Sequence, residues 1–251
     1  MAREHRRRPR IGVLYAPGTN CHEETAFAVE LAGGDGIVLP LHDLLAGEAR
    51  LQDFQGLVIP GGFSYGDHVA AGRVFAVQIL ARLRDALGRF ADRHPVLGIC
   101  NGYQVLIEAG LLPGCGEDAT LGERLGALAQ NRSARFESRW SRMLGTPDGG
   151  IWTEGLVGRV IRLPVAHGEG RMLIRPGCCA LSAFVYVDAE DHPTEKYPWN
   201  PAGSPGGVAG TVDAAGLVAG LMPHPERASL PSHGSTDGLR IFQNMVRCCG
   251  G

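Results

Sequence analysis

Short apolar runs alternate with longer segments of helical spacing through about the first 110 residues of this 251-residue chain. Strands that are apolar throughout are typical of a parallel sheet, because helices bury both of its faces. The alternation therefore predicts an α/β fold with a mostly parallel central sheet flanked by helices. The apolar runs cover residues 11–16, 37–41, 56–60 and 96–99, and the helical segments cover residues 22–31, 73–90 and 103–109.

The pattern changes in the middle of the chain. Residues 126–188 form a β-rich middle section, in which Gly-Gly and Pro-Asp dipeptides separate short apolar stretches. Two further strands, residues 208–212 and 217–222, flank Asp213–Gly216 and predict a hairpin. Residues 237–248 have the spacing of a helix that closes the chain.

Composition indicates an ordinary globular protein. Hydrophobic residues make up 44% of the chain, charged residues make up 20%, and the net charge is −2. This balance gives no electrostatic reason to expect nucleic acid or a membrane surface as a partner. No apolar stretch approaches the roughly 18 residues of a membrane span, so we expect a cytoplasmic protein. No repeat or Pro/Ser-rich linker divides the chain, which predicts one domain over residues 11–251 behind a basic, flexible tail of residues 1–10.

The seven cysteines are an odd number, which favours reduced thiols over a disulfide framework. The adjacent pairs Cys178–Cys179 and Cys248–Cys249 lack the two-residue spacer of a zinc knuckle, so no metal site is expected at either pair.

One cysteine lies between a predicted strand and a predicted helix, in the sequence Gly98-Ile99-Cys100-Asn101-Gly102. This G-x-C-x-G pattern is typical of a nucleophile elbow, a strained turn in which neighbouring side chains must be small. The helix that follows would lower the pKa of the thiol and direct free N–H groups towards an oxyanion. A buried structural cysteine in a β-α turn is the alternative for this pattern.

A cysteine nucleophile needs a base, and the base needs a group that orients it. His224 directly follows an apolar strand, in the sequence Met222-Pro223-His224-Pro225-Glu226. The prolines favour an extended chain, in which residues two apart project to the same side. His224 and Glu226 are therefore candidates for the base and its orienting carboxylate. A rigid surface loop with a solvated glutamate is the alternative.

Glycines also follow the third apolar run, in Gly61-Gly62-Phe63-Ser64-Tyr65-Gly66-Asp67. The lysine and spacing of a phosphate-binding P-loop are missing. We expect instead that this loop brings one backbone N–H to a developing oxyanion, while the N–H of Asn101 approaches it from the other side.

The elbow and the His224 segment together resemble the class I, triad-type glutamine amidotransferases. Further motifs resemble one branch of that family, the glutaminase component of phosphoribosylformylglycinamidine synthase. The matches run from residue 17 to residue 227, nearly the whole chain. The motifs of the branch are Pro17-Gly-Thr-Asn-Cys21, Gly61-Gly-Phe-Ser-Tyr-Gly-Asp67, Asn131-Arg-Ser-Ala-Arg-Phe-Glu137, Ala166-His-Gly-Glu-Gly170 and Asn200-Pro-Ala-Gly-Ser204.

The resemblance implies a flavodoxin-like amidotransferase fold and a role for each matching residue. Cys100 would be the nucleophile, His224 the general base and acid, and Glu226 the residue that orients His224. The glutamine pocket and its oxyanion donors would be formed by Gly62, Phe63, Asn101, Gln104, Asn131, Arg135 and Phe136.

The reaction implied by the resemblance is hydrolysis of L-glutamine to glutamate and ammonia through a cysteine thioester. The ammonia would pass to a PurL-type synthetase partner, which converts formylglycinamide ribonucleotide to the amidine in de novo purine biosynthesis. ATP and Mg²⁺ would be used by that partner, and no cofactor or metal is expected in this chain. Whether a small PurS-type bridging subunit takes part is left open.

Two positions depart from the usual pattern of the family. His22 stands where the family usually has an acidic residue, and Ala202 stands where it usually has asparagine. Neither belongs to the triad. Both are expected to affect the contact with the synthetase rather than the chemistry.

Two other functions share part of this pattern. A cysteine hydrolase or protease of the related α/β superfamily would usually take its histidine from beside the cysteine, where this chain has Asn101. An inactive amidotransferase-like binding module is disfavoured because Cys100, His224 and Glu226 are all present.

Overall fold

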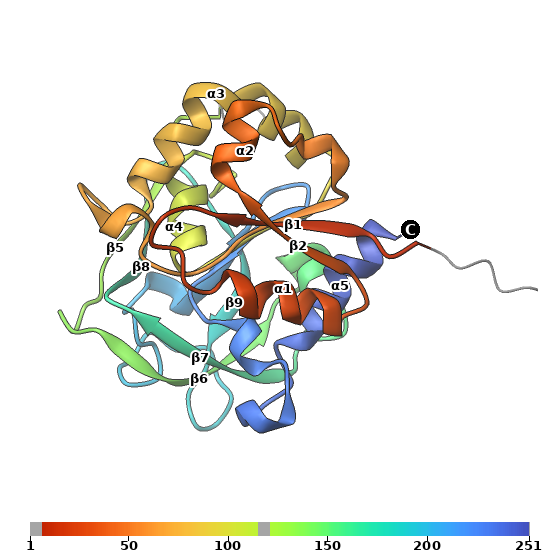
Figure 1. The fold of residues 1–251 in the computed structure, drawn as a ribbon. Helices are drawn as coiled ribbons and strands as arrows, with labels where there is room; N and C mark the ends of the chain where they lie inside the picture. Colours follow the sequence, from red (N-terminus) through yellow and green to blue (C-terminus); the bar gives the residue numbers. More distant parts are fainter. Residues whose placement is uncertain (1–6, 115–120, 251) are drawn as a thin grey trace, which may run out of the picture.

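The computed structural model describes residues 7–114 and 121–250, and its centre is a large sheet (Figure 1). In the described residues the sheet has nine strands in the order β2-β1-β3-β4-β11-β10-β9-β6-β7. The bounds of these strands are β1 Arg10–Tyr15, β2 Asp35–Pro40, β3 Gly56–Ile59, β4 Val96–Ile99, β6 Glu137–Gly145, β7 Val160–His167, β9 Leu181–Tyr186, β10 Val208–Val212 and β11 Val218–Leu221. A separate antiparallel pair consists of β5 Gly126–Gln130 and β8 Glu169–Ile174.

The sheet has a parallel half and an antiparallel half. Strands β2, β1, β3, β4 and β11 pair in parallel, and the remaining neighbours pair antiparallel. The predicted α/β fold with a parallel sheet is therefore confirmed, and the β-rich middle section extends that sheet with antiparallel strands. The predicted hairpin is also confirmed, because β10 and β11 pair across residues 213–217.

Helices cover both faces of the parallel half (Figure 1). Helices α3 and α4 pack together on one face, while α1 and α5 pack together on the other. Each face of β1, β3 and β4 is thereby buried, which explains their continuous apolar runs. The bounds of the helices are α1 His22–Leu31, α2 Leu41–Ala46, α3 Arg73–Ala91, α4 Asn101–Glu108 and α5 Leu239–Cys249.

One strand boundary and one short helix differ from the sequence-based expectation. Strand β1 begins at Arg10, which pairs with Asp35, so the part of the predicted tail that the structure describes ends one residue earlier. Residues 1–6 of that tail lie outside the described residues. The short helix α2 follows Pro40 directly and was not predicted, because six residues are too few to show helical spacing.

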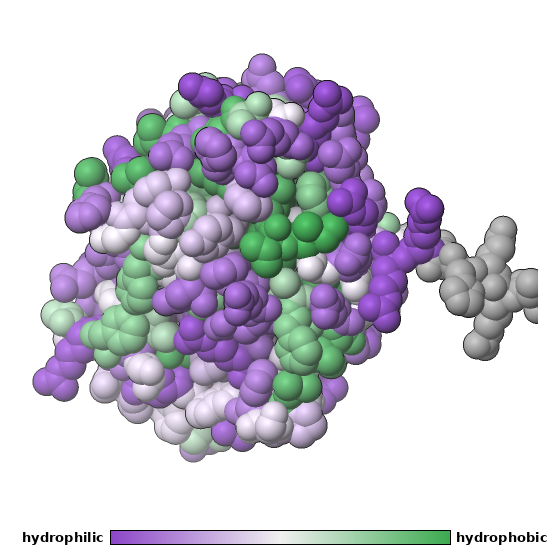
Figure 2. Space-filling model, viewed as in Figure 1, coloured by the Kyte–Doolittle hydropathy of each residue, from purple (hydrophilic) through white to green (hydrophobic). Residues whose placement is uncertain are grey.

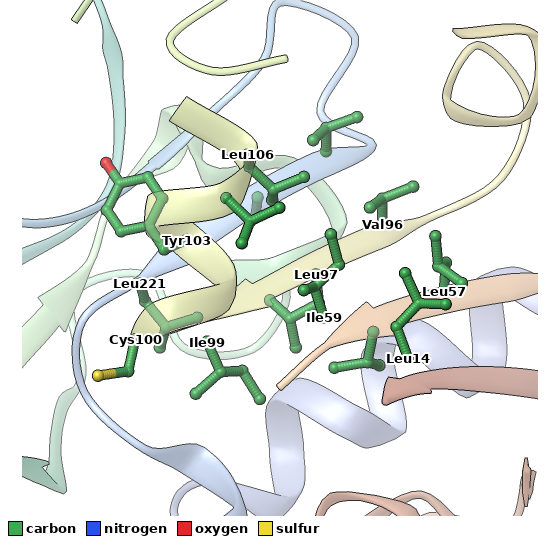
Figure 3. Packing of buried hydrophobic residues seen from close by; sticks show 14 of the residues in the cluster. Leu14, Leu57, Ile59, Val96, Leu97, Ile99, Cys100, Tyr103, Leu106 and Leu221 are labelled. Carbon is green, nitrogen blue, oxygen red and sulfur yellow. The ribbon is translucent and has the colours of Figure 1, made fainter. Parts of the chain in front are cut away.

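One buried apolar cluster joins the two halves of the sheet. Around β4 it includes Leu97, Ile99, Tyr103 and Leu106, and the sulfur of Cys100 points away from these packed side chains (Figure 3). The surface in the view of Figure 1 is mainly hydrophilic, with apolar residues in separate areas (Figure 2). Within the part of the chain that the structure describes, no helix combines the length and the apolar character needed to cross a bilayer.

Candidate active site

Cys100 occupies the tight turn between β4 and α4 and has φ 50° and ψ −106°. A non-glycine residue with positive φ is strained, and such strain concentrates at functional sites. A Cβ on Gly102 would lie 1.8 Å from the carbonyl oxygen of Ile59, and a Cβ on Gly98 would lie 2.7 Å from that of Gly102. The glycines on both sides of the cysteine are therefore required, as the elbow pattern predicts.

The sulfur of Cys100 lies between the two halves of the sheet. The backbone N–H of Cys100 donates to the carbonyl of Leu221 at 2.8 Å, which fixes the elbow to the end of β11. Its Sγ lies 3.7 Å from the carbonyl oxygen of Ala166, at the end of β7. The residue is only 6% exposed, yet it lines two cavities that open beside it.

His224 and Glu226 form a buried pair directly after β11. The Nδ1 of His224 donates to Oε1 of Glu226 at 2.5 Å, and the two side chains are 2% and 0% exposed. The backbone N–H of His224 donates to the carbonyl of Pro164 at 2.8 Å, which fixes the segment against β7. Because Nδ1 is engaged with the carboxylate, Nε2 is the atom left for exchanging a proton.

The charge of the imidazole is set by its neighbours. Burial alone would lower the pKa of His224, but the carboxylate of Glu226 and then the thiolate of Cys100 raise it well above its ordinary value. A protonated His224 next to Cys100 can stabilise the negative charge that a cysteine nucleophile carries when it reacts.

Replacing Glu226 with glutamine should lower kcat/KM for glutamine hydrolysis, the reaction that the resemblance implies, by about 10²- to 10⁴-fold, because the imidazole loses the anion that fixes its tautomer. The stability should change with pH as well. His224 has a folded-state pKa above its unfolded value of about 6.5. Its contribution to stability is therefore complete below about pH 6.5 and disappears as the pH rises through the folded-state pKa.

Denaturant unfolding of both proteins between pH 6 and 9 measures this effect. The difference in unfolding free energy between wild type and Glu226→Gln should be largest at pH 6 and should shrink as the pH rises. A difference that is constant over this range would show that the carboxylate does not hold a proton on His224.

The loop after β3 approaches Cys100 from the other side. Gly62 has φ +147°, and a Cβ there would lie 2.7 Å from the backbone nitrogen of Asn20. The N–H of Asn101 belongs to the first turn of α4, where N–H groups have no partner within the helix. This arrangement fits the expected oxyanion donors Gly62 and Asn101, whose role is taken up below as part of the proposal.

Two cavities share one wall in front of Cys100. Their volumes are about 220 Å³ and 200 Å³, and both are lined by Gly62, Phe63, Phe136 and Ala166 as well as Cys100. Phe63 is 48% exposed and Phe136 is 54% exposed, so these rings border the openings. Gln104, which the resemblance implies for the glutamine pocket, also lines the first cavity.

Two residues expected in this pocket lie elsewhere. Asn131 is 3% exposed and its amide is used inside the protein: Nδ2 donates to the carbonyls of Arg135 and His167, and Oδ1 accepts from Gly170. Arg135 lines a different cavity of about 690 Å³. Asn131 therefore supports the wall of the site from inside the protein, and Arg135 is not among the described residues that line the two cavities beside Cys100.

Cys21 was not predicted as part of the site, although it is buried beside the triad. Its Sγ accepts from Nη2 of Arg227 at 3.0 Å, and burial raises the pKa of its thiol. Its sequence signal was its place at the end of Pro17-Gly-Thr-Asn-Cys21, one of the motifs that carry the resemblance to the family branch. Cys21 and Cys100 line the same cavity, so the site contains two thiols that must be told apart experimentally.

Cys21, His224 and Glu226 also have ligand atoms within 4.8 Å of one another, which is close enough to consider a metal ion. The guanidinium of Arg227 on the sulfur and the protonated state of the Cys21 thiol both oppose a cation there. The second nitrogen of the imidazole serves the nucleophile. We therefore interpret the group as part of the catalytic machinery rather than as a metal site.

The two departures from the family pattern lie in different surroundings. Ala202 is 0% exposed, so its methyl group cannot contact a partner, contrary to the expectation from the sequence. The turn around it is closed by Asn200, whose Oδ1 accepts from the N–H groups of Gly203 and Ser204. His22 packs against Tyr15, with the ring centroids 4.5 Å apart and the ring planes tilted by 52°.

The fold, the cysteine elbow and a buried His–Glu pair directly after the neighbouring strand are together typical of the triad-type glutamine amidotransferases. Residues 8–249 match the family model of the CobB/CobQ-like glutamine amidotransferase domain. The subunit PurQ of phosphoribosylformylglycinamidine synthase from Dehalococcoides mccartyi is 39% identical over 94% of this chain and 95% of its own. The corresponding subunit from Pyrococcus furiosus is 38% identical over 94% and 97%. The chain belongs to the family of PurQ subunits.

A solved structure agrees with this assignment. A chain in the structure of PurLQS from Thermotoga maritima superposes with a TM-score of 0.77 at 32% identity, covering 96% of this chain and 98% of its own. A glutamine amidotransferase structure from the same organism has a TM-score of 0.58 at 16% identity, which supports the fold alone.

Proposed function

We propose that this chain hydrolyses L-glutamine to glutamate and ammonia and supplies the ammonia to a synthetase partner. The partner converts formylglycinamide ribonucleotide to formylglycinamidine ribonucleotide in de novo purine biosynthesis. The observation that carries the proposal is the strained Cys100 next to the buried pair of His224 and Glu226. The family assignment supplies the substrate and the pathway.

The reaction follows from the positions of these groups. The Cys100 thiolate attacks the carboxamide carbon of glutamine, and the N–H groups of Gly62 and Asn101 stabilise the oxyanion. His224 gives its proton to the leaving nitrogen, so ammonia departs and a γ-glutamyl thioester remains. His224 then takes a proton from water, which attacks the thioester and releases glutamate with the thiolate restored.

The partner follows from the fate of the ammonia. Free ammonia would be lost to solvent, so a partner must receive it at the openings bordered by Phe63 and Phe136. The related Thermotoga maritima chain belongs to an assembly named PurLQS. We therefore infer a PurL-type synthetase and a PurS-type subunit as partners, with ATP and Mg²⁺ used by the synthetase and no cofactor in this chain. The place of the reaction would be the cytoplasm.

A glutamine-like chloroketone tests this function directly. Incubation with the complex should abolish glutamate release from glutamine and add one mass increment to the peptide that contains Cys100. Cys21 should remain unmodified, because burial raises the pKa of its thiol. Modification of Cys21 with Cys100 left free would overturn the assigned nucleophile. Hydrolysis of peptides instead of glutamine would favour the cysteine hydrolase interpretation.

A further inference from the structure

The cavity of about 690 Å³ that Arg135 lines has no part in the mechanism. Its walls come from two segments: the loop of residues 131–136, between β5 and β6, and residues 195–203, after β9. The sequence singled out a motif in each segment, yet the residues that line this cavity take no part in the chemistry of Cys100. The cavity therefore needs an explanation of its own.

The lining of this cavity is mainly cationic. Arg132, Arg135 and Lys196 are exposed side chains of its wall, and the ion pairs among residues 7–114 and 121–250 include none of them. One acid, Glu195, also lines it, and its Oε1 accepts from the backbone N–H of Gly206 at 2.6 Å. Like charges around one cavity repel one another, so the three cations of this cationic cavity favour an occupant with several negative charges.

The two walls are held together by the fold itself. The backbone N–H of Arg132 donates to the carbonyl of Ala202 at 3.0 Å. The buried Asn200 closes the second segment, because its Oδ1 accepts from the N–H groups of Gly203 and Ser204. A Cβ on Gly203 would lie 2.5 Å from the Cβ of Arg132, so the two segments also touch there. The cationic cavity is therefore preformed and needs no occupant to shape it.

Asn131 connects the cationic cavity to the active site. Its Nδ2 donates to the carbonyl of Arg135 at 2.9 Å, in the wall of the cavity, and to the carbonyl of His167 at 2.8 Å, in the segment beside Cys100. Phe136, which follows Arg135 directly, lines both cavities beside Cys100. An occupant of the cationic cavity would therefore lie next to the openings at which the ammonia must be passed on.

Exposed aromatic rings extend this surface beyond the cationic cavity. Tyr197 lines the cavity and is 59% exposed, and the guanidinium of Arg139 lies 4.8 Å from the centre of its ring. Arg139 also lines a second cavity, of about 270 Å³, together with Trp140 and Trp199. Arginine and aromatic side chains are enriched in protein interfaces. A small anion would leave these rings in water, whereas a protein partner can cover both cavities.

We propose that the cationic cavity holds an acidic segment of the synthetase partner, whose carboxylates pair with Arg132, Arg135 and Lys196. The inference rests on the proposed function and deepens it, because it names the charge of the partner surface that docks beside the active site. The cations account for the acidic character of the segment, and the neighbouring rings account for a protein rather than a free anion. Since Asn131 and Phe136 join the cavity to the openings beside Cys100, docking there aligns those openings with the partner.

Charge reversal in the cationic cavity tests this proposal. In Arg132→Glu and Lys196→Glu, the Kd for the purified synthetase, with the PurS-type subunit and glutamine present, should rise about 10- to 100-fold, because like charges then face each other. Both side chains are exposed, so the Tm of each free variant should stay within about 2 °C of wild type. Arg82→Glu makes the same change of charge on the exposed side of α3, outside the cavity, and should leave the Kd within about twofold.

Salt provides a second readout. The Kd of the wild-type chain should rise between about 50 and about 300 mM salt, and the rise should be smaller in the variant that carries both charge reversals. Arg82→Glu should keep the salt dependence of the wild type.

Kd values within about twofold of wild type in both charge reversals would overturn the proposal. Binding of ATP or inorganic phosphate to the free chain that is lost in both variants, while the synthetase still binds normally, would also overturn it, because the cavity would then hold a small anion. The Kd needs no turnover. A wild-type complex that assembles in this charge-dependent way but releases no glutamate from glutamine would therefore count against the proposed function alone.

Discussion

Alanine in place of Cys100 is expected to reduce the glutamine-dependent turnover of the complex by about 10⁵-fold or more. No other group can form the thioester, because Cys21, the other described thiol lining these cavities, is held as a thiol by burial. Turnover supported by added ammonia should remain at the wild-type level, because the synthetase does not need the glutaminase step. Both rates are measured on the assembled complex with the ribonucleotide substrate and ATP.

Cys248→Ala serves as the matched control, because this cysteine is exposed near the end of α5 and lines neither cavity. It should leave both rates unchanged. Glutamine-dependent turnover that persists in Cys100→Ala would eliminate the thioester mechanism. Loss of the ammonia-dependent rate as well would show that the substitution disrupts the complex.

Alanine in place of Gly102 is expected to lower the free energy of unfolding by about 3 kcal/mol or more. The new methyl carbon would lie 1.8 Å from the carbonyl oxygen of Ile59, which is backbone and cannot move aside without shifting β3. Since α4 begins at this turn, the displacement should also misplace Cys100 and abolish glutamine hydrolysis. Denaturant unfolding and glutamate release measure the two effects.

The opposite result is expected for Gly88→Ala. Gly88 lies inside α3, and a Cβ there would meet only the Leu121 side chain at 3.6 Å. Alanine is favoured over glycine in a helix, so the variant should be more stable by up to about 1 kcal/mol and fully active. Equal destabilisation by both substitutions would contradict the steric explanation for the elbow.

Much of the fold and the triad could be predicted from local sequence. The elbow glycines, the strand before His224 and the helix over residues 22–31 have short patterns with direct physical causes, and the structure has all three elements. The position of the Asn131 side chain could not be predicted, because it depends on the carbonyl of His167 at a distant place in the chain. Asp67 and Glu169 could not be paired from the sequence either, because the 3₁₀ turn Ser64–Asp67 and strand β8 are distant in the chain but line one cavity.

The placement of nucleophile and base on adjacent strands has a consequence for how this enzyme can vary. Strands β4 and β11 are hydrogen-bonded neighbours, and the 2.8 Å bond from Cys100 to Leu221 fixes their register at the site. More than a hundred residues separate Cys100 from His224 in the chain, but this pairing, with the bond from the His224 N–H to the Pro164 carbonyl on β7, aligns the reacting atoms. Surface turns of the antiparallel half that do not contact Cys100 or His224 can therefore change length, and adapt to a different synthetase. Such changes would not move the reacting atoms.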